Sequence, residues 1–478
     1  MQRARLRDHA VWEAGERSWM LPLVDLDGPA EASTYFVPLA LAWEDRDEEQ
    51  LKTLMPGAVA KVRQQADVGV MADAFCDESF CRAMVNAIGL RTELPTARGK
   101  LLFRPTAAFA ALAGDGIDAM AVTPPSAHSS NTVVTLGEQL FLKGYRRLRP
   151  GINPELEVGR FLTEVARFPN CVPVAGALEY AADDGSVMTL AIVQAYVPNQ
   201  GDGWDYTLAY LERHLESLRT FDAPQPEDVH GGFLALIHTL GERTAELHLA
   251  LSTQSGDAAF DPQPVTTEDV RQWRERAGAE AARTLELLSE RLSELSPEVQ
   301  DDAKRLLSHA QEVRQRVAEF PLEGQDGLKT RYHGDYHLGQ VLVSRNDFLI
   351  IDFEGEPART FEERRQRSSA LRDVAGMVRS FNYAHWSALR RVAQSADELV
   401  KLEAAASDWE TQTRNAFLNA YGERMIEGGS RQSGEAAERL LALFEFEKAM
   451  YELRYELSNR LDWVQVPLQG ILALVDRA

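Results

Sequence analysis

The chain has 478 residues, of which 45% are hydrophobic, so it is long enough to bury a substantial core divided among two or three domains. Its formal net charge is −22, from 73 acidic and 51 basic residues, and such a field repels nucleic acids and anionic membranes. The cysteines Cys76, Cys81 and Cys171 are too few for a disulfide framework. No apolar run approaches the roughly 20 residues of a membrane span. These features predict a cytoplasmic protein that binds neither nucleic acid nor membrane.

Residues 1–91 are predicted to form an N-terminal cap domain. Apolar residues alternate or cluster at Trp19–Val24 and Thr34–Ala42, which predicts strands there, and a helix is expected over Asp73–Ile88. We find no catalytic spacing in this segment.

Residues 92–200 are predicted to form a small antiparallel sheet with one helix. The helix is expected to begin at Asn153-Pro154, because Asn is a good N-cap residue and Pro fits the first helical position. Short apolar runs predict strands at Gly99–Arg104, Ala119–Thr123, Asn131–Thr135, Gln139–Lys143 and Val187–Tyr196.

Residues 201–478 are predicted to be mainly helical. Ser296-Pro297 should break a charged pair of helices over residues 267–320, whose charged faces are expected to be solvated. Further helices are predicted at residues 205–218, 231–251, 370–396, 398–424 and 434–460.

A hairpin interrupts these helices and carries the most informative residues of the chain. Val341–Val343 and Phe348–Ile351 are apolar runs separated by a four-residue turn, and antiparallel pairing would set Gln340 nearly opposite Asp352. Asp335 precedes Gln340 by five residues on an irregular segment and is expected to curl over the same end. Carboxylate and amide oxygens suit Mg²⁺, which keeps phosphate oxygens in its remaining positions. The carboxylate of Asp335 is then placed to accept a proton from an attacking hydroxyl.

The pattern His333-x-Asp335, then Gln340, then a strand ending before Asp352, resembles the catalytic residues of protein kinases and of phosphotransferases with the same fold. Here Gln340 replaces the usual Asn. The longer segments HGDYHLGQVL, IIDFEGEP, SSALRDVAGMVRSFNYA and YELRYELSNRLDWVQVP make roughly residues 20–475 similar to the maltokinases. The resemblance implies an α+β, bilobal protein-kinase-like fold. Its parts would be the cap (1–91), a nucleotide-binding N-lobe with a small antiparallel sheet (92–200) and a helical C-lobe (201–478). Many relatives begin with an Arg-Trp-Phe-containing segment that is absent here, which implies a trimmed N-terminus.

The resemblance also implies roles for individual residues. Asp335 would be the catalytic base with His333 beside it, although the corresponding His more often holds the loop in shape. Asp373, in LRDVAGM, is expected to be a scaffold residue on a helix whose carboxylate accepts hydrogen bonds from loop N–H groups. Lys143 would form ion pairs with the phosphates of the nucleotide. The carboxylate of Glu157 would hold Lys143 in place, with Glu155 as the alternative. The Mg²⁺ ligands would be Gln340, Asp352 and Glu354. Further nucleotide contacts are expected from Ser129, Ser130, Asn131 and Thr132 of a polar loop and from Gln194 and Tyr196 of the connection between the lobes.

A sugar site is predicted on the last long helix. Glu452, Tyr455 and Glu456 are spaced i, i+3, i+4 and can therefore face one cleft, with Arg460 and Trp463 close by. An aromatic stripe of this kind is also typical of a helix core.

The resemblance implies ATP-dependent, Mg²⁺-requiring phosphorylation of maltose at its anomeric hydroxyl. The product, maltose 1-phosphate, would feed α-glucan synthesis from trehalose, with a trehalose synthase as an expected associate. An alternative is a kinase of glucosamine or a related aminosugar with the same fold. A further alternative is a non-catalytic pseudokinase that acts as a scaffold, which the presence of Lys143, Asp335 and Asp352 disfavours.

Overall fold

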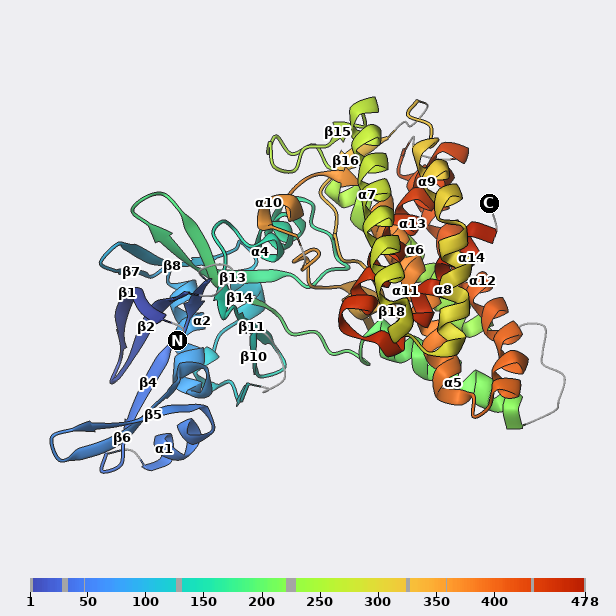
Figure 1. Ribbon diagram of the computed structural model, residues 1–478. Coiled ribbons are helices and arrows are strands. Elements are labelled where there is room, and N and C mark those ends of the chain that lie inside the picture. Colours follow the sequence, from blue (N-terminus) through green and yellow to red (C-terminus); the bar gives the residue numbers. More distant parts are fainter. Residues whose placement is uncertain are drawn as a thin grey trace. The chain divides into compact units, whose positions relative to one another are not determined.

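The computed structural model describes residues 3–27, 33–46, 48–125, 131–220, 229–323, 327–357, 359–430 and 434–476. The chain forms two compact units, the first made of Met1–Pro198 with Pro357–Arg364 and the second of Asn199–Glu356 with Arg365–Ala478. The first unit is rich in strands and the second in helices (Figure 1).

The first unit is built on antiparallel sheets. One sheet has the order β12-β3-β2-β4-β6-β5, with β1 paired to β2, and the other has the order β7-β8-β13-β14-β11-β10-β9. The strands of the first sheet are β1 (Arg3–Ala14), β2 (Arg17–Asp27), β3 (Ser33–Phe36), β4 (Leu39–Trp43), β5 (Ala58–Gln64), β6 (Asp67–Asp73) and β12 (Arg147–Leu148). Those of the second are β7 (Glu93–Pro95), β8 (Gly99–Pro105), β9 (Val122–Thr123), β10 (Thr132–Leu136), β11 (Leu140–Gly144), β13 (Val174–Ala182) and β14 (Val187–Ala195). Short helices connect them: α1 (Glu48–Leu54), η1 (Met55–Gly57), η2 (Ala74–Cys76), α2 (Glu78–Gly89), α3 (Phe109–Ala113), η3 (Ile117–Ala119), α4 (Pro154–Arg160) and the π-helical turn η4 (Phe161–Val165).

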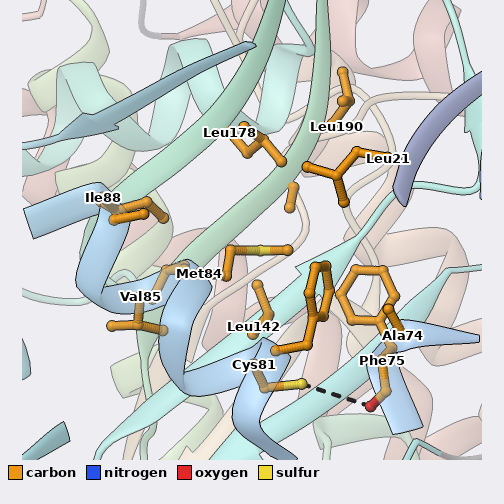
Figure 2. Packing of buried hydrophobic residues seen from close by; sticks show 14 of the residues in the cluster. Leu21, Ala74, Phe75, Cys81, Met84, Val85, Ile88, Leu142, Leu178 and Leu190 are labelled. Carbon is orange, nitrogen blue, oxygen red and sulfur yellow. Dashed lines mark hydrogen bonds between the residues drawn. The ribbon is translucent and has the colours of Figure 1, made fainter. Parts of the chain in front are cut away.

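One hydrophobic cluster joins the two sheets of this unit through α2. The ring of Trp12 on β1 lies 5.2 Å from that of Trp19 on β2 and 5.2 Å from that of Phe103 on β8. Figure 2 shows Met84 and Ile88 of α2 among side chains from both sheets, and the Cys81 thiol donates to the carbonyl of Phe75 at 3.5 Å. Residues 1–91 and 92–198 thus share a core, and their division into a cap and a lobe stays a prediction.

A buried carboxylate also connects the two sheets. Asp8 on β1 accepts hydrogen bonds from the Thr96 hydroxyl at 2.6 Å, the Tyr180 hydroxyl at 2.8 Å and the backbone amides of Ala97 and Arg98 at 3.1 Å. Burial alone would raise the pKa of Asp8, but these donors together lower it. The ionised carboxylate therefore holds β1 against the β7–β8 turn and β13.

The segment 357–364 belongs to the first unit although it follows, in the chain, the hairpin of residues 341–350. It contains α10 (Phe361–Arg364). The guanidinium groups of Arg149 and Arg364 both lie 5.5 Å from the ring of Phe361, and Arg149 donates to the carbonyl of Arg359 at 3.3 Å. These contacts account for its membership of this unit.

The second unit consists of packed helices around the hairpin. Its short strands are β15 (Gln263–Pro264), β16 (Leu328–Thr330), β17 (Val341–Ser344), β18 (Asp347–Ile350) and β19 (Ser368–Ser369). Its helices are α5 (Gly203–Thr220), α6 (Gly231–Leu251), α7 (Thr267–Arg291), η5 (Leu292–Glu294), α8 (Pro297–Ser308), α9 (Ala310–Ala318), η6 (Leu338–Gln340), α11 (Leu371–Val392), α12 (Ala396–Glu427), α13 (Glu435–Asn459), η7 (Leu461–Trp463) and α14 (Gln465–Asp476). Helix α13 packs against α7, α11 and α14, and its Leu453 and Leu457 are fully buried. Among the described helices, none combines the length and apolarity required to cross a membrane.

Most predicted elements are present, and the exceptions have physical causes. The strand expected at Ala119–Thr123 is reduced to Val122–Thr123, because Ile117–Ala119 forms a 3-10 turn after Gly116, whose φ is +99°. Strand β13 was not predicted, since Ala and Gly dilute its apolar pattern. The charged region 267–320 forms α7, α8 and α9 rather than a pair, because the chain also breaks at Ser308-His309.

Candidate active site

The loop between β16 and β17 is held from α11. Asp373, near the start of α11, accepts hydrogen bonds from the backbone amides of His333 at 2.7 Å and Gly334 at 2.9 Å. Its carboxylate also contacts Nε2 of His248 on α6 at 3.1 Å. The predicted scaffold role of Asp373 is confirmed, whereas His248 was not anticipated because it lies more than a hundred residues away in the sequence.

Two glycines let the loop approach the segment after β18 and helix α11. Gly334 has φ +87°, and a Cβ there would lie 3.2 Å from the Cα of Gly355. A Cβ on Gly376 of α11 would lie 2.5 Å from the backbone oxygen of Tyr336. One turn further along α11, the hydroxyl of Ser380 accepts from the amide of Leu338 at 3.2 Å. The face of α11 that carries Asp373, Gly376 and Ser380 thus fixes the path of the loop.

His333 is buried inside this loop. Its Nδ1 accepts from the amide of Asp335 at 3.3 Å, so Nε2 carries the proton and donates to the carbonyl of Ile351 at 2.8 Å. Its ring packs against Phe353 at 4.9 Å and Tyr336 at 5.2 Å. Both ring nitrogens are therefore engaged in holding the loop beside the hairpin, which favours the structural alternative over the catalytic role given to His333 above.

The hairpin turns more tightly than predicted. Arg345 and Asn346 both have positive φ, 53° and 61°, so they form a two-residue turn, and Ser344 pairs with Asp347 inside the ladder. The resulting register pairs Val341 with Ile350, and the amide of Ile351 donates to the carbonyl of Gln340 at 3.0 Å. Gln340 therefore lies opposite Ile351, next to Asp352, in agreement with the expectation that it lies nearly opposite Asp352.

The acidic residues after β18 lie close together. A carboxylate oxygen of Asp352 and one of Glu354 lie within 4.8 Å of each other, and both side chains are partly buried. Asp352 has φ +63°, which is uncommon outside glycine and typical of strained functional positions. Carboxylates and the side-chain amide oxygen of a residue such as Gln340, whose backbone carbonyl accepts from Ile351, are hard oxygen donors of the kind that Mg²⁺ prefers, so the residue types fit the predicted cation.

Asp335 contacts a residue that the sequence did not point to. One of its carboxylate oxygens lies 3.5 Å from Nζ of Lys448 on α13, and the Lys448 ammonium also lies 5.2 Å from the ring of Tyr451. Burial would lower the pKa of Lys448, but the charges of Asp335, Glu356 and Glu452 outweigh it and raise that pKa. Lys448 lies one helical turn before Glu452, so extending the predicted sugar face by i−4 would have found it.

The predicted sugar residues are engaged in ion pairs of their own. Glu452 pairs with the buried Arg379 of α11 at 2.8 Å. Glu456 is buried and pairs with Arg460 at 2.6 Å, although its burial raises its pKa. Tyr455 is 45% exposed. Arg460 also lies 5.4 Å from the ring of Trp463, which follows α13 on η7. The structure brings these side chains to one end of α13, and their contact with a sugar stays a prediction.

In the first unit, Lys143 is held by a carboxylate of α4. Its Nζ lies 2.8 Å from Oε2 of Glu155, which also accepts from the Tyr145 hydroxyl at 2.5 Å. The choice of Glu157 as this partner is corrected in favour of Glu155. The Asn153 cap accepts from the Glu155 amide at 2.9 Å, and the helix starting there turns Glu155, only 3% exposed at its side chain, inward beneath β11.

The other residues predicted to contact the nucleotide lie either outside the described residues or in and beside strands of the first unit. Ser129 and Ser130 lie outside the described residues. Asn131 precedes β10, and the Thr132 hydroxyl accepts from Nε of Arg146 at 2.6 Å. Gln194 lies on β14, and the amide of Tyr196 donates to the carbonyl of Gln139 at 2.8 Å, so that donor is used within the unit. Nucleotide binding by these residues stays a prediction.

Comparison with known proteins gives two kinds of result. No protein-family model matches this sequence. A glucosamine kinase of Mycolicibacterium smegmatis (strain ATCC 700084 / mc(2)155) is 27% identical over 303 residues, which are 63% of this chain and 66% of that protein. A glucosamine kinase of Streptacidiphilus jiangxiensis is 26% identical over 342 residues, or 71% of this chain and 70% of that protein. The chain therefore spans about two thirds of the length of these curated relatives.

A solved structure described as glucosamine kinase in complex with glucosamine, ADP and inorganic phosphate superimposes with a TM-score of 0.68 at 22% identity. The superposition covers 99% of this chain and 94% of that one. The chain has this fold. Antiparallel sheets and many helices are therefore shown, whereas the arrangement of two kinase lobes stays a prediction.

These findings correct the assignment of the acceptor. The curated relatives and the solved structure are named for glucosamine, and the resemblance to maltokinases is not borne out by them. The expectation of maltose phosphorylation, with its product feeding α-glucan synthesis, was wrong, and these findings do not support a trehalose synthase as associate. The motifs around Asp335 and Asp352 resemble those of phosphotransferases in general and do not distinguish one sugar from another.

Proposed function

We propose that this protein is an ATP-dependent, Mg²⁺-requiring kinase of glucosamine or a closely related aminosugar. The observation that carries the proposal is the match over 63–71% of the chain to relatives named glucosamine kinase. The local geometry supports it, since a carboxylate on a fixed loop and a pair of carboxylates on a hairpin are the parts that phosphoryl transfer requires.

In this proposal Asp335 accepts the proton of an acceptor hydroxyl as that oxygen forms a bond to the γ-phosphorus of ATP. The bond from this phosphorus to its bridging oxygen breaks, and ADP leaves with the electron pair. Asp352 and Glu354, with Gln340 beside them, would hold Mg²⁺, which neutralises phosphate charge when bound. For Lys143, which Glu155 holds within the first unit, contact with the nucleotide phosphates stays a prediction.

The surroundings of Asp335 in the second unit favour a cationic acceptor. The carboxylates of Asp335, Glu356 and Glu452 all act on Lys448, and Arg379 pairs with one of them. Glu356 is buried, so its charge is screened only weakly by solvent. An acceptor with an ammonium group is attracted to such an acidic environment more strongly than a neutral sugar.

The decisive experiment compares sugars with the purified full chain. ADP release would be measured with ATP and Mg²⁺ at a series of concentrations of glucosamine, glucose and maltose. We expect kcat/KM for glucosamine to exceed that for either neutral sugar by at least about tenfold, which corresponds to ~1.4 kcal/mol of discrimination. A preference for glucose or maltose would contradict the aminosugar proposal. ADP binding without turnover of any of the sugars would favour the non-catalytic scaffold.

A further inference from the structure

The proposed base is fixed at its backbone and not at its side chain. The amide of Asp335 donates to His333, and the preceding peptide is held by Asp373. In the described part of the chain, the carboxylate of Asp335 lies 3.5 Å from the ammonium group of Lys448. The direction of the carboxylate therefore depends on where this ammonium is placed.

Lys448 is placed by a helix that is clamped on several sides. On α13, Glu447 pairs with Arg372 of α11 at 2.9 Å, and Glu452 pairs with Arg379 of the same helix at 2.8 Å. Further pairs connect α13 to α12 and α7: Glu445 with Arg414 at 2.8 Å and Arg454 with Glu280 at 2.5 Å. Partly buried pairs of this kind resist sliding or rotation of a helix, because moving it would leave charges unpaired. The ammonium thus extends from a rigid element.

The spacing of the pair leaves the base able to react. At 3.5 Å the Lys448–Asp335 pair is longer than a charge-assisted hydrogen bond, whereas the Lys143–Glu155 pair is 2.8 Å. The lone pairs of the Asp335 carboxylate are consequently not committed to a short bond with Lys448. The ammonium orients the carboxylate by charge and leaves an oxygen to accept a proton.

We propose that Lys448 is a positioning residue that aims the Asp335 carboxylate at the acceptor hydroxyl, a role that rests on the proposed phosphoryl transfer. Lys448 acts through Asp335 and forms no bond to substrate in this role. The prediction concerns the turnover of bound substrates more than their binding, because misdirecting a general base lowers the rate of the chemical step.

The test uses three variants of the full chain. Lys448→Met removes the charge and keeps most of the length, and Lys448→Arg keeps the charge. The matched control is Lys304→Met, because Lys304 pairs with Asp301 at 3.1 Å on the exposed surface of α8. For each variant, kcat and the KM values for ATP and glucosamine would be measured, together with the melting temperature and ADP affinity.

We expect Lys448→Met to lower kcat by about tenfold to a hundredfold while the KM for ATP changes less than about threefold. Lys448→Arg should recover at least about a third of the parental kcat, and Lys304→Met should be indistinguishable from the parent. ADP affinity and melting temperature close to parental values would show that the loss in Lys448→Met is not unfolding.

Three outcomes would overturn the role of Lys448. They are a parental kcat in Lys448→Met, a kcat in Lys448→Arg as low as that of Lys448→Met, or a loss confined to KM. Failure of the proposed function is distinguishable, since the parent chain itself would then not phosphorylate glucosamine, and the role of Lys448 would fall with it.

Discussion

The two units each contain a lysine paired with a carboxylate, and the two pairs differ in tightness. Glu155 in the first unit is buried, lies 2.8 Å from Lys143 and also accepts from Tyr145, so this pair fixes its lysine. Asp335 in the second unit lies 3.5 Å from Lys448, and both side chains are partly exposed, at 21% and 27%. The comparison teaches that a carboxylate used to hold a lysine is saturated with donors, whereas one expected to take a proton keeps an oxygen available.

The largest effect is expected from changing Asp335, the carboxylate of the Asp335–Lys448 pair. Asp335→Asn keeps the size and the loop contacts but cannot accept a proton, so kcat should fall by about 10²–10⁴-fold with an unchanged melting temperature. Steady-state ADP release and calorimetry provide the two measurements. Near-parental turnover would remove Asp335 from the mechanism.

The tighter pair is tested by changing its carboxylate. Glu155→Gln keeps a hydrogen-bond acceptor for Tyr145 but removes the charge that fixes Lys143, so kcat/KM for ATP should fall by about tenfold to a hundredfold. Glu157→Gln on the same helix is the matched control and should change this value less than about threefold. Equal losses in both variants would contradict the assignment of Glu155 over Glu157.

The backbone of the loop that carries Asp335 can be disturbed without changing any charge. Gly376→Ala places a Cβ 2.5 Å from the Tyr336 oxygen, so we expect the loop to shift, with a loss of ~1–3 kcal/mol in stability and a lower kcat. Gly422→Ala on α12 is the control, since nothing lies within 4 Å of its Cβ, and it should be neutral or stabilise by ~0.5–1 kcal/mol. Denaturant unfolding and activity assays would separate the two variants, and identical behaviour would refute the close packing of α11 on the loop.

The smallest effect is expected from changing Asp8 in the first unit, which leaves the Lys143–Glu155 and Lys448–Asp335 pairs intact. The pKa of Asp8 is lowered in the folded state, so its contribution to stability is present above the ordinary Asp value near 4 and is lost as the pH falls through the lower folded value. Asp8→Asn should therefore cost ~1 kcal/mol at pH 7 and progressively less below pH 4. Hydrogen exchange of a peptide covering β1 would report it, with the exposed Asp115→Asn as control. A cost that is independent of pH would show that the charge of Asp8 is not what stabilises β1.

The sequence allowed the hairpin, most helices and the scaffold role of Asp373 to be predicted, because each depends on local pattern. Predictions that depend on contacts between residues far apart in the sequence were less reliable. The turn was expected to contain four residues and contains two, because the positive φ of Arg345 and Asn346 lets Ser344 pair with Asp347. Glu155 and Glu157 have the same chemistry and lie on the same correctly predicted helix, and the packing of α4 in the folded unit decides which one reaches Lys143. Lys448 and His248 reach the loop through tertiary packing, which leaves no spacing signal beside Asp335. The acceptor was wrong because the shared motifs encode the transfer and not the sugar.

Residues 357–364 belong to the first unit, whereas the residues on both sides of them belong to the second. This has a consequence for dividing the protein into fragments. The polypeptide passes from one unit to the other near residues 198, 356 and 364, so no single cut yields two complete halves. A fragment ending at Pro198 would lack Phe361 and the ring that Arg149 covers, and expression of either portion alone would sever a native segment. A protease nick near residue 198 would split the chain into two polypeptides, and the segment 357–364 would keep its contacts with Arg149 across that break.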